Sequence, residues 1–435
     1  MLMPMSQAAA TGSVLATSAR RRVMRRLMPF LFLLYVVAYI DRNNVGFAGL
    51  QMTGELGFSD AAFGFGSGVF FIGYVLLGIP GAMLVEKWSA RKALAITMLA
   101  WGCVASTTGL IHTETQFYAA RFVLGVTEAA FFPGIITYLG HWFRGQDRAK
   151  AVALFMAAIP VSQVIAAPLS AALMKAHWLG LSGWRWLLIL EGAPALVCGI
   201  VSIFYLTDWP RNAGWLKPAE REWLSEALAS ESSRASAAGK LSFWQAIRDR
   251  DILLLCAAYF GGTMGNYGVN LWMPKMIQRL GHLGASQTAL LAAIPAMAAV
   301  PAMLLCGWHS DRTGERRWHT AAPRFAAALG LAIVPLSFVN VPIALGLFAI
   351  GLSGIIAAYP PLWAIPTTFL GPTAAAASIG LISSLGNLGG FAGPYVIGWF
   401  STRTGSYAAG LWSVSVAIFL SGVFLLMVRG RARHS

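Results

Sequence analysis

Charged side chains are scarce in this sequence. Lys, Arg, Asp and Glu together make up 11% of its 435 residues, against roughly 25% in soluble domains. Because so few charges cannot cover a surface exposed to water, the composition excludes a soluble enzyme and a disordered protein. Hydrophobic residues make up 57%, and they gather in runs of about 20 residues, the length of a helix that crosses a bilayer.

Cysteine and histidine are scarce as well. The four cysteines all lie inside apolar runs, and no pair has the C-x-x-C spacing, so we interpret them as small apolar residues rather than as disulfides or metal ligands. None of the seven histidines lies deep in an apolar run, which argues against a metal site or a histidine proton relay. No phosphate-binding loop is present, so we expect no ATPase and no bound cofactor.

The apolar runs predict an all-α membrane protein with twelve transmembrane helices. A polar segment at 208–250 divides them into a six-helix bundle over 27–207 and a second over 251–428. Residues 1–26, rich in Ala, Ser and Arg, are expected to form a flexible cytoplasmic tail, and 429–435 a second tail. The expected spans are 27–50, 61–85, 92–111, 117–140, 150–174, 184–207, 251–277, 287–308, 321–338, 342–365, 377–400 and 408–428.

The basic residues predict the orientation. If the N-terminus is placed in the cytoplasm, 25 of the 32 Lys and Arg residues fall in or at the edges of cytoplasmic segments, and five fall in or near the segments on the other side. Arg324 is counted among the 25. Cytoplasmic loops carry such an excess, so both termini are expected in the cytoplasm. The net charge of +15 therefore reflects topology, and we expect no nucleic-acid partner.

The two halves share a loop pattern. "EKWSARK" follows the second span and "SDRTGERR" follows the eighth; Glu86 and Asp311 are 225 residues apart, as are Arg91 and Arg316. We predict that these four residues and Arg312 are gating or loop charges. A duplicated six-helix unit around a site at the membrane midplane is the usual plan of secondary transporters.

Four charges lie within predicted spans: Asp41 and Arg42 in the first, Arg121 and Glu128 in the fourth. Each costs at least about 2.5–3.5 kcal/mol at the bilayer centre. They could be inert ion pairs that join two helices, or lie near the span ends and reach the interface. The pair at 41–42 lies about 14 residues into a run of 24, which favours a functional site. Glu191 in the sixth span is interpreted as structural, with Arg185 as a possible partner.

Other spans carry polar and aromatic residues that suit a polar cavity with aromatic walls. Proline and glycine in spans 2, 4, 5, 10 and 11 would let those helices bend during gating. The residues expected to line the cavity, besides the two arginines, are Tyr39, Tyr74, Asn270, Trp363, Ser383 and Asn387.

Several stretches resemble a known family. The twelve-span layout and the "SDRTGERR" loop look like the major facilitator superfamily, and more narrowly its anion–cation symporter family, with tartrate and phthalate carriers and the galactonate and glucarate carriers as the nearest types. The matching stretches are "YIDRNNVGFA", "RFVLGVTEAAFFPG", "WRWLLILEGAPA", "YGVNLWMPKMI" and "LGNLGGFAGPYVIG".

The resemblance implies roles for the matching residues. Arg42 would contact the substrate carboxylate, with Tyr39 and Tyr74 in the same pocket. Arg121 would pair with Glu128 or hold the anion, and Asp41 and Glu128 would be the protonation sites. Many relatives have Asn at the position of Ser383.

These features predict a carrier that imports a small organic anion with protons across a bacterial inner membrane, by alternating access and as a monomer in the bilayer. The proton is the coupling ion, and no other cofactor is expected. One alternative is a facilitator that exports an uncharged or drug-like substrate. The other is a sensor or enzyme of the membrane, but the sequence shows no intramembrane nucleophile and no sizeable soluble domain.

Overall fold

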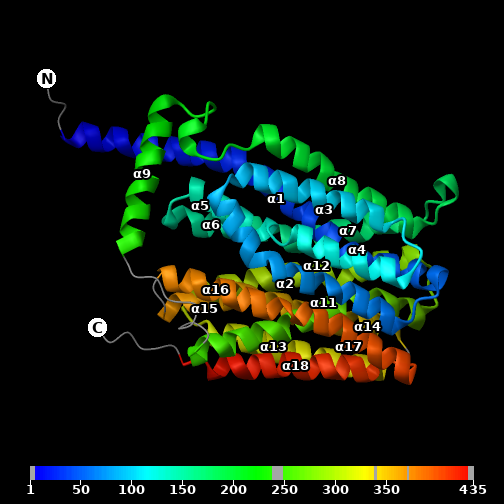
Figure 1. Ribbon diagram of the computed structural model, residues 1–435. Helices are drawn as coiled ribbons and strands as arrows, with labels where there is room; N and C mark the ends of the chain where they lie inside the picture. Colours follow the sequence, from blue (N-terminus) through cyan, green and yellow to red (C-terminus); the bar gives the residue numbers. More distant parts are fainter. Residues whose placement is uncertain (1–4, 238–247, 338–339, 370–371, 430–435) are drawn as a thin grey trace.

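The computed structural model describes residues 5–237, 248–337, 340–369 and 372–429. These residues form helices and no strand. Most of the helices run side by side along one direction, and α9 (Pro218–Ala237) lies across one end of the bundle (Figure 1). The predicted all-α architecture is therefore confirmed.

The N-terminal half supplies six passages of the chain through the bundle, two of which are broken into two helices. Its helices are α1 (Met5–Leu56), α2 (Asp60–Lys87), α3 (Ala90–Thr108), α4 (Glu114–Glu128), α5 (Phe131–Trp142), α6 (Gly145–Met156), α7 (Ala158–Leu173) and α8 (Gly183–Tyr205).

The C-terminal half repeats this plan, with breaks in its fourth and fifth passages. Its helices are α11 (Arg250–Gly281), α12 (Ala285–Thr313), α13 (Arg317–Ile333), α14 (Val341–Ala357), α15 (Tyr359–Phe369), α16 (Pro372–Asn387), α17 (Gly389–Thr404) and α18 (Ala408–Met427).

Ten helical segments of the described chain are long and apolar enough to cross a membrane. The two further passages are α3 and the pair α16 and α17, which lie alongside the others in the bundle (Figure 1). The predicted breaks appear in the fourth, fifth, tenth and eleventh passages, whereas α2 continues through Pro80.

The N-terminal tail differs from the prediction. It is not a flexible segment from residue 5 onward, because α1 begins at Met5 and runs on into the first span. Arg20 forms an ion pair of 2.6 Å with Asp147, and the Ser18 hydroxyl donates to Glu220 at 2.6 Å. These contacts with α6 and α9 hold the tail as a helix.

The two halves meet closely at the end of the bundle away from α9. Asp60, the first residue of α2, accepts from Lys275 at 2.6 Å and from Arg279 at 3.0 Å, both on α11. Ser401 on α17 and Tyr407 also donate to Asp60, at 2.7 and 3.1 Å. We call Asp60 and these four partners the Asp60 cluster; it joins the halves through a buried carboxylate.

Candidate substrate site

Arg42 lies midway along the membrane part of α1, and its side chain is 8% exposed. Its guanidinium carbon is 5.0 Å from the ring centroid of Tyr39, 5.2 Å from that of Tyr74 and 5.5 Å from that of Phe70. Aromatic faces attract a cation and still leave its N–H groups available. Arg42 is therefore held by rings on two helices, α1 and α2.

Glu128 forms an ion pair with Arg42. It is fully buried at the last position of α4, directly before the break between α4 and α5. Only one of its oxygens is satisfied, because Oε2 has no hydrogen-bond partner among the described residues. Glu128 therefore binds one arginine through one carboxylate oxygen, and its second oxygen accepts no hydrogen bond from a described residue.

Arg121 is the second cation of the site. It is 3% exposed, lies 5.0 Å from the ring centroid of Phe70, and its Nε makes no hydrogen bond with a described residue. The spacing of seven residues suggested Glu128 as a partner, yet Glu128 pairs with Arg42. Arg121 instead lines a cavity together with Arg42.

That cavity lies between the two halves. Its volume is about 20 Å³, enough for about one water molecule, so a substrate needs the walls to move apart. The lining residues are Arg42, Asn43, Val45, Ser67, Phe71, Arg121, Tyr267, Asn270, Leu271 and Pro394.

Asp41 is directed away from Arg42. It is 2% exposed and accepts from the Trp101 indole at 3.0 Å and from Asn44 at 3.2 Å. Neighbours in a helix sequence point about 100° apart, so adjacency in the chain does not bring the two side chains together. Asp41 therefore anchors α1 to α3.

The C-terminal half contributes Tyr267 and Asn270 from α11. The Arg42 guanidinium donates to the Tyr267 hydroxyl at 3.4 Å, and Asn270 donates to the Asn266 carbonyl at 2.8 Å. The residues expected to bind substrate include Asn270 and not Tyr267. Tyr267 does belong to the polar and aromatic residues of the seventh predicted span that suit such a cavity, Tyr259, Asn266, Tyr267, Asn270 and Trp272.

Five expected residues are not among those that line this cavity. Tyr39 and Tyr74 face the Arg42 guanidinium instead, and Trp363, Ser383 and Asn387 lie away from the cavity. The Trp363 ring is 4.8 Å from that of Tyr259, and Asn387 donates to Ser383 at 3.3 Å. They belong to α15 and α16, whereas the cavity is lined by α1, α2, α4, α11 and α17.

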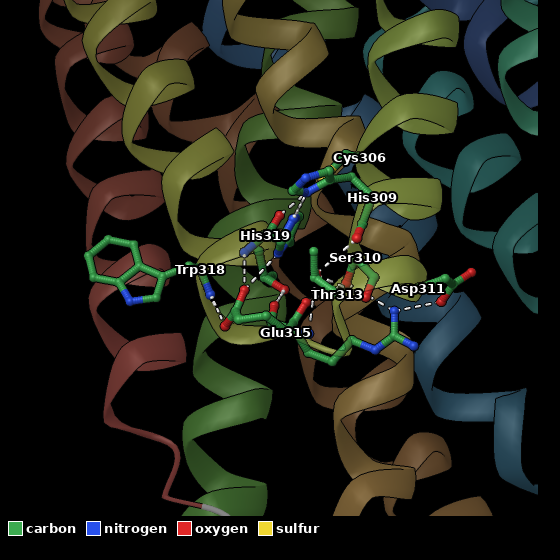
Figure 2. A network of polar contacts seen from close by, with 10 residues as sticks. Cys306, His309, Ser310, Asp311, Thr313, Glu315, Trp318 and His319 are labelled. Carbon is green, nitrogen blue, oxygen red and sulfur yellow. Dashed lines mark hydrogen bonds and ion pairs between the residues drawn. The ribbon is translucent and has the colours of Figure 1, made fainter.

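Of the predicted loop charges, Arg316 pairs with Asp311 and Arg91 lies close to Asp208 of the central segment. Figure 2 shows Asp311, Ser310 and Glu315 in the connection between α12 and α13, where Arg316 contacts Asp311 at 2.6 Å. Arg312 is exposed, 5.6 Å from the Trp308 ring. Arg91 lies 4.0 Å from Asp208, and the Glu86 side chain lies outside the described residues.

Glu315 closes the N-terminal end of α13. Its carboxylate accepts from the backbone N–H groups of Trp318 at 2.8 Å and His319 at 3.1 Å. Burial raises the pKa of Glu315, but these hydrogen bonds and the His319 side chain outweigh it and lower the pKa below the usual value.

The suggested pair of Glu191 and Arg185 is wrong. Glu191 accepts from Ser170 at 2.9 Å, while Arg185 contacts Glu55 at 3.2 Å and donates to the carbonyls of Gly109 and Ile111. Residues six apart point about 120° apart around a helix and lie about 9 Å apart along it, which accounts for the difference.

A family model described as Major Facilitator Superfamily matches residues 31–394. The chain belongs to the major facilitator superfamily. It is therefore a membrane transporter and not an enzyme.

Named relatives cover nearly the whole chain. A protein of Agrobacterium vitis named "Putative tartrate transporter" is 44% identical over 96% of this chain and 96% of its own length. The "Quinolone resistance transporter" of Acinetobacter baumannii is 35% identical over 94% of each. A crystal structure of a bacterial homologue of the human lysosomal transporter Spinster, inward-facing and occupied, has a TM-score of 0.74 at 16% identity, covering 92% of this chain and 96% of that one; it shows the fold alone.

Proposed function

We propose that the protein is a symporter that imports a small organic anion with protons across a bacterial inner membrane. Tartrate, another dicarboxylate, an aromatic acid and a sugar acid are the candidate substrates, and the 44% identical relative named for tartrate favours the first. The observation that carries the proposal is the cavity itself: Arg42 and Arg121 both line it, and in the described part of the chain Glu128 is the carboxylate that forms an ion pair with one of them.

The charges supply a reason for proton coupling. With Glu128 ionised, Arg42 is neutralised by its ion pair, while Arg121 has Asp41 as a nearby negative charge but forms no ion pair with it. A proton on Glu128 would release Arg42 for a bidentate contact with the substrate carboxylate. Proton and anion would then favour each other's binding by the same factor, which is the thermodynamic basis of symport.

The test is uptake of labelled tartrate by proteoliposomes. With an inward proton gradient we expect accumulation above the external concentration, and with the gradient collapsed by a protonophore we expect equilibration only. Uptake that is concentrative without any ion gradient, or that ignores the proton gradient, would contradict proton symport. Thermal stabilisation by a panel of organic acids identifies the ligand first.

An exporter of a drug-like substrate is the second candidate, because the quinolone-resistance relative shares 35% identity. An exporter of uncharged or cationic compounds has no use for two buried arginines in its cavity. Stabilisation by such compounds, with none by the organic acids, would favour this candidate.

A further inference from the structure

Arg324 on α13 is a buried cation outside the site described above. It is 0% exposed, and Nε, Nη1 and Nη2 all lack a hydrogen-bond partner among the described residues. Because Arg324 lies near the start of the ninth predicted span, it counts among the cytoplasmic charges of the sequence. Its side chain nevertheless does not reach the surface. An arginine left without an acceptor inside a membrane bundle is costly.

Aromatic hydroxyls surround this cation. The guanidinium carbon is 5.4 Å from the ring centroid of Tyr359, and Tyr259 is its other electrostatic neighbour. The two tyrosine rings are 6.0 Å apart, and both residues are partly exposed. On the other side, a Cβ at Gly262 would collide with the guanidinium, so the arginine occupies space that glycine leaves free.

Among the residues that the structure describes, no carboxylate forms an ion pair with Arg324. From residue 251 onward the sequence contains three acidic residues, Asp251, Asp311 and Glu315. Asp251 accepts from the backbone of Arg429, Asp311 pairs with Arg316, and Glu315 caps α13. In the N-terminal half, Asp41 and Glu128 are held by Trp101 and Arg42. Tyr359 and Tyr259 are thus the charge neighbours that the structure gives Arg324, which leaves room for a counter-charge from a bound anion.

We propose that Arg324, with the hydroxyls of Tyr259 and Tyr359, forms a second carboxylate-binding subsite in the C-terminal half. This rests on the proposed function, since the anion is one that the carrier transports. Tyr259 precedes Tyr267 by eight residues on α11, which is about 12 Å along the helix axis. Since Tyr267 contacts Arg42, the subsite lies between the level of Arg42 and the end of the bundle that carries α9. Its ligand is either the second carboxylate of a substrate held by Arg42 or the carboxylate of a second molecule.

Tyr359 lies where the subsite could open. It begins α15 directly after the break that follows Ala357, and Pro360 and Pro361 come next in the chain. Because proline has no backbone N–H, Pro360 and Pro361 cannot donate a hydrogen bond back to the last turn of α14. If α15 rotates or bends relative to α14 at this break, the Tyr359 ring moves away from the guanidinium. Arg324 would then become exposed when the carrier changes conformation.

Binding of tartrate and threonate by the purified full-length protein tests the subsite. Threonate keeps the hydroxyls of tartrate but has one carboxylate. We expect Arg324→Gln to weaken tartrate binding by about tenfold or more, the value of one charge-assisted hydrogen-bonded contact, and to leave threonate within about twofold. That result assigns the second carboxylate of one molecule. Weaker binding of both anions, with a stoichiometry that falls from two to one, assigns a second molecule.

Two further variants separate a subsite from a structural role. Gly262→Ala keeps the charge of Arg324 but displaces its guanidinium, so it should weaken tartrate binding as Arg324→Gln does. The matched control is Gly346→Ala on α14, where a Cβ meets no atom within 4 Å. Arg324→Met should raise the melting temperature of the ligand-free protein, because it removes an unbalanced buried charge.

Unchanged affinity and stoichiometry in Arg324→Gln would overturn the subsite, and so would a melting temperature lowered by Arg324→Met. A wild-type protein that binds neither tartrate nor any other acid of the panel refutes the proposed function itself, and the subsite with it. Binding by the wild type that Arg324→Gln leaves intact refutes the subsite alone.

Discussion

Which carboxylate faces which arginine decides how much charge the cavity presents to a substrate. Glu128 contacts Arg42, and Asp41 instead accepts from Trp101 and Asn44. A proton on Glu128 therefore changes the state of Arg42 directly, whereas a proton on Asp41 acts first on the contact between α1 and α3. Glu128 is thus the better candidate for the coupling residue.

Glu128→Gln tests this assignment. The amide copies the neutral acid, so we expect the variant to bind substrate and to exchange it in counterflow, but to lose accumulation driven by a proton gradient. Paired counterflow and uptake measurements in proteoliposomes check both halves of the expectation. If Glu128→Gln still concentrates substrate under the gradient, coupling belongs to Asp41 or to another residue.

In the proposed mechanism Arg42 binds the substrate carboxylate. A guanidinium presents paired donors to a carboxylate, and a lysine ammonium cannot reproduce them. We expect both Arg42→Lys and Arg42→Ala to lose substrate binding by about a hundredfold or more, since a buried charge-assisted contact to carboxylate is worth about 3 kcal/mol. Calorimetric titration measures the loss, and an unchanged elution profile controls for folding. Wild-type affinity in either variant would exclude Arg42 as the anchor.

The sequence predicts which charges are buried better than it predicts their partners. Asp41, Arg42, Arg121 and Glu128 stand out because apolar runs surround them. Their partners depend on how each helix is rotated against its neighbours, which a single sequence does not reveal. Arg324 is the sharpest case: its place near a span end suggested the membrane interface, yet its guanidinium is buried beside Gly262 on α11 and Tyr359 on α15.

At the scale of elements, helix existence and helix breaks follow from composition. Gly and Pro mark the breaks in four passages, and the one before α5 places Glu128 at a helix end. The extension of α1 through the Arg-rich tail was not predicted. It depends on contacts with α6 and α9, which are remote in the sequence.

The cap of α13 makes a prediction about pH. The pKa of Glu315 is lowered in the folded protein, so its carboxylate stabilises the fold above the unfolded pKa of about 4.3, and this contribution disappears as the pH falls through the folded value. Glu315→Ala should cost about 0.5–2 kcal/mol at pH 7, as loss of a helix cap does, and less in acid. Thermal unfolding across this range checks the loss, with the exposed Glu222→Ala as control. An equal loss at all pH values would contradict the capping role.

At the scale of the whole molecule, the basic residues predict which side each end faces. Both termini and the 208–250 segment should be cytoplasmic, because 25 of 32 basic residues lie on that side. Alkaline phosphatase fused at Ser236 should be inactive, since it needs the periplasm, and a fusion at His112 should be active. The reverse pattern would invert the topology.

The Asp60 cluster makes the last prediction, on alternating access. It joins α2 to α11 and α17 at the end away from α9, and it contains a buried ion pair between Asp60 and Lys275, whose side chains are 8% and 10% exposed. Removal of one partner from a buried pair costs about 3–5 kcal/mol, comparable to the difference between two states of a carrier. Asp60→Asn should therefore shift the protein toward the state that is open at this end.

Spin labels at His112 and Arg403, exposed positions in the two halves, report the opening when the four native cysteines are replaced by alanine. We expect Asp60→Asn to add a population with a longer distance between the labels. Asp147→Asn is the control, because it breaks an ion pair with Arg20 within one half and should leave the distances unchanged. A distance distribution that is identical in Asp60→Asn and the wild type would mean that packing, and not this carboxylate, holds the two halves together. The glycines at this end, where Gly64 faces the Pro394 carbonyl and Gly398 faces that of Asp60, would then be the elements to alter.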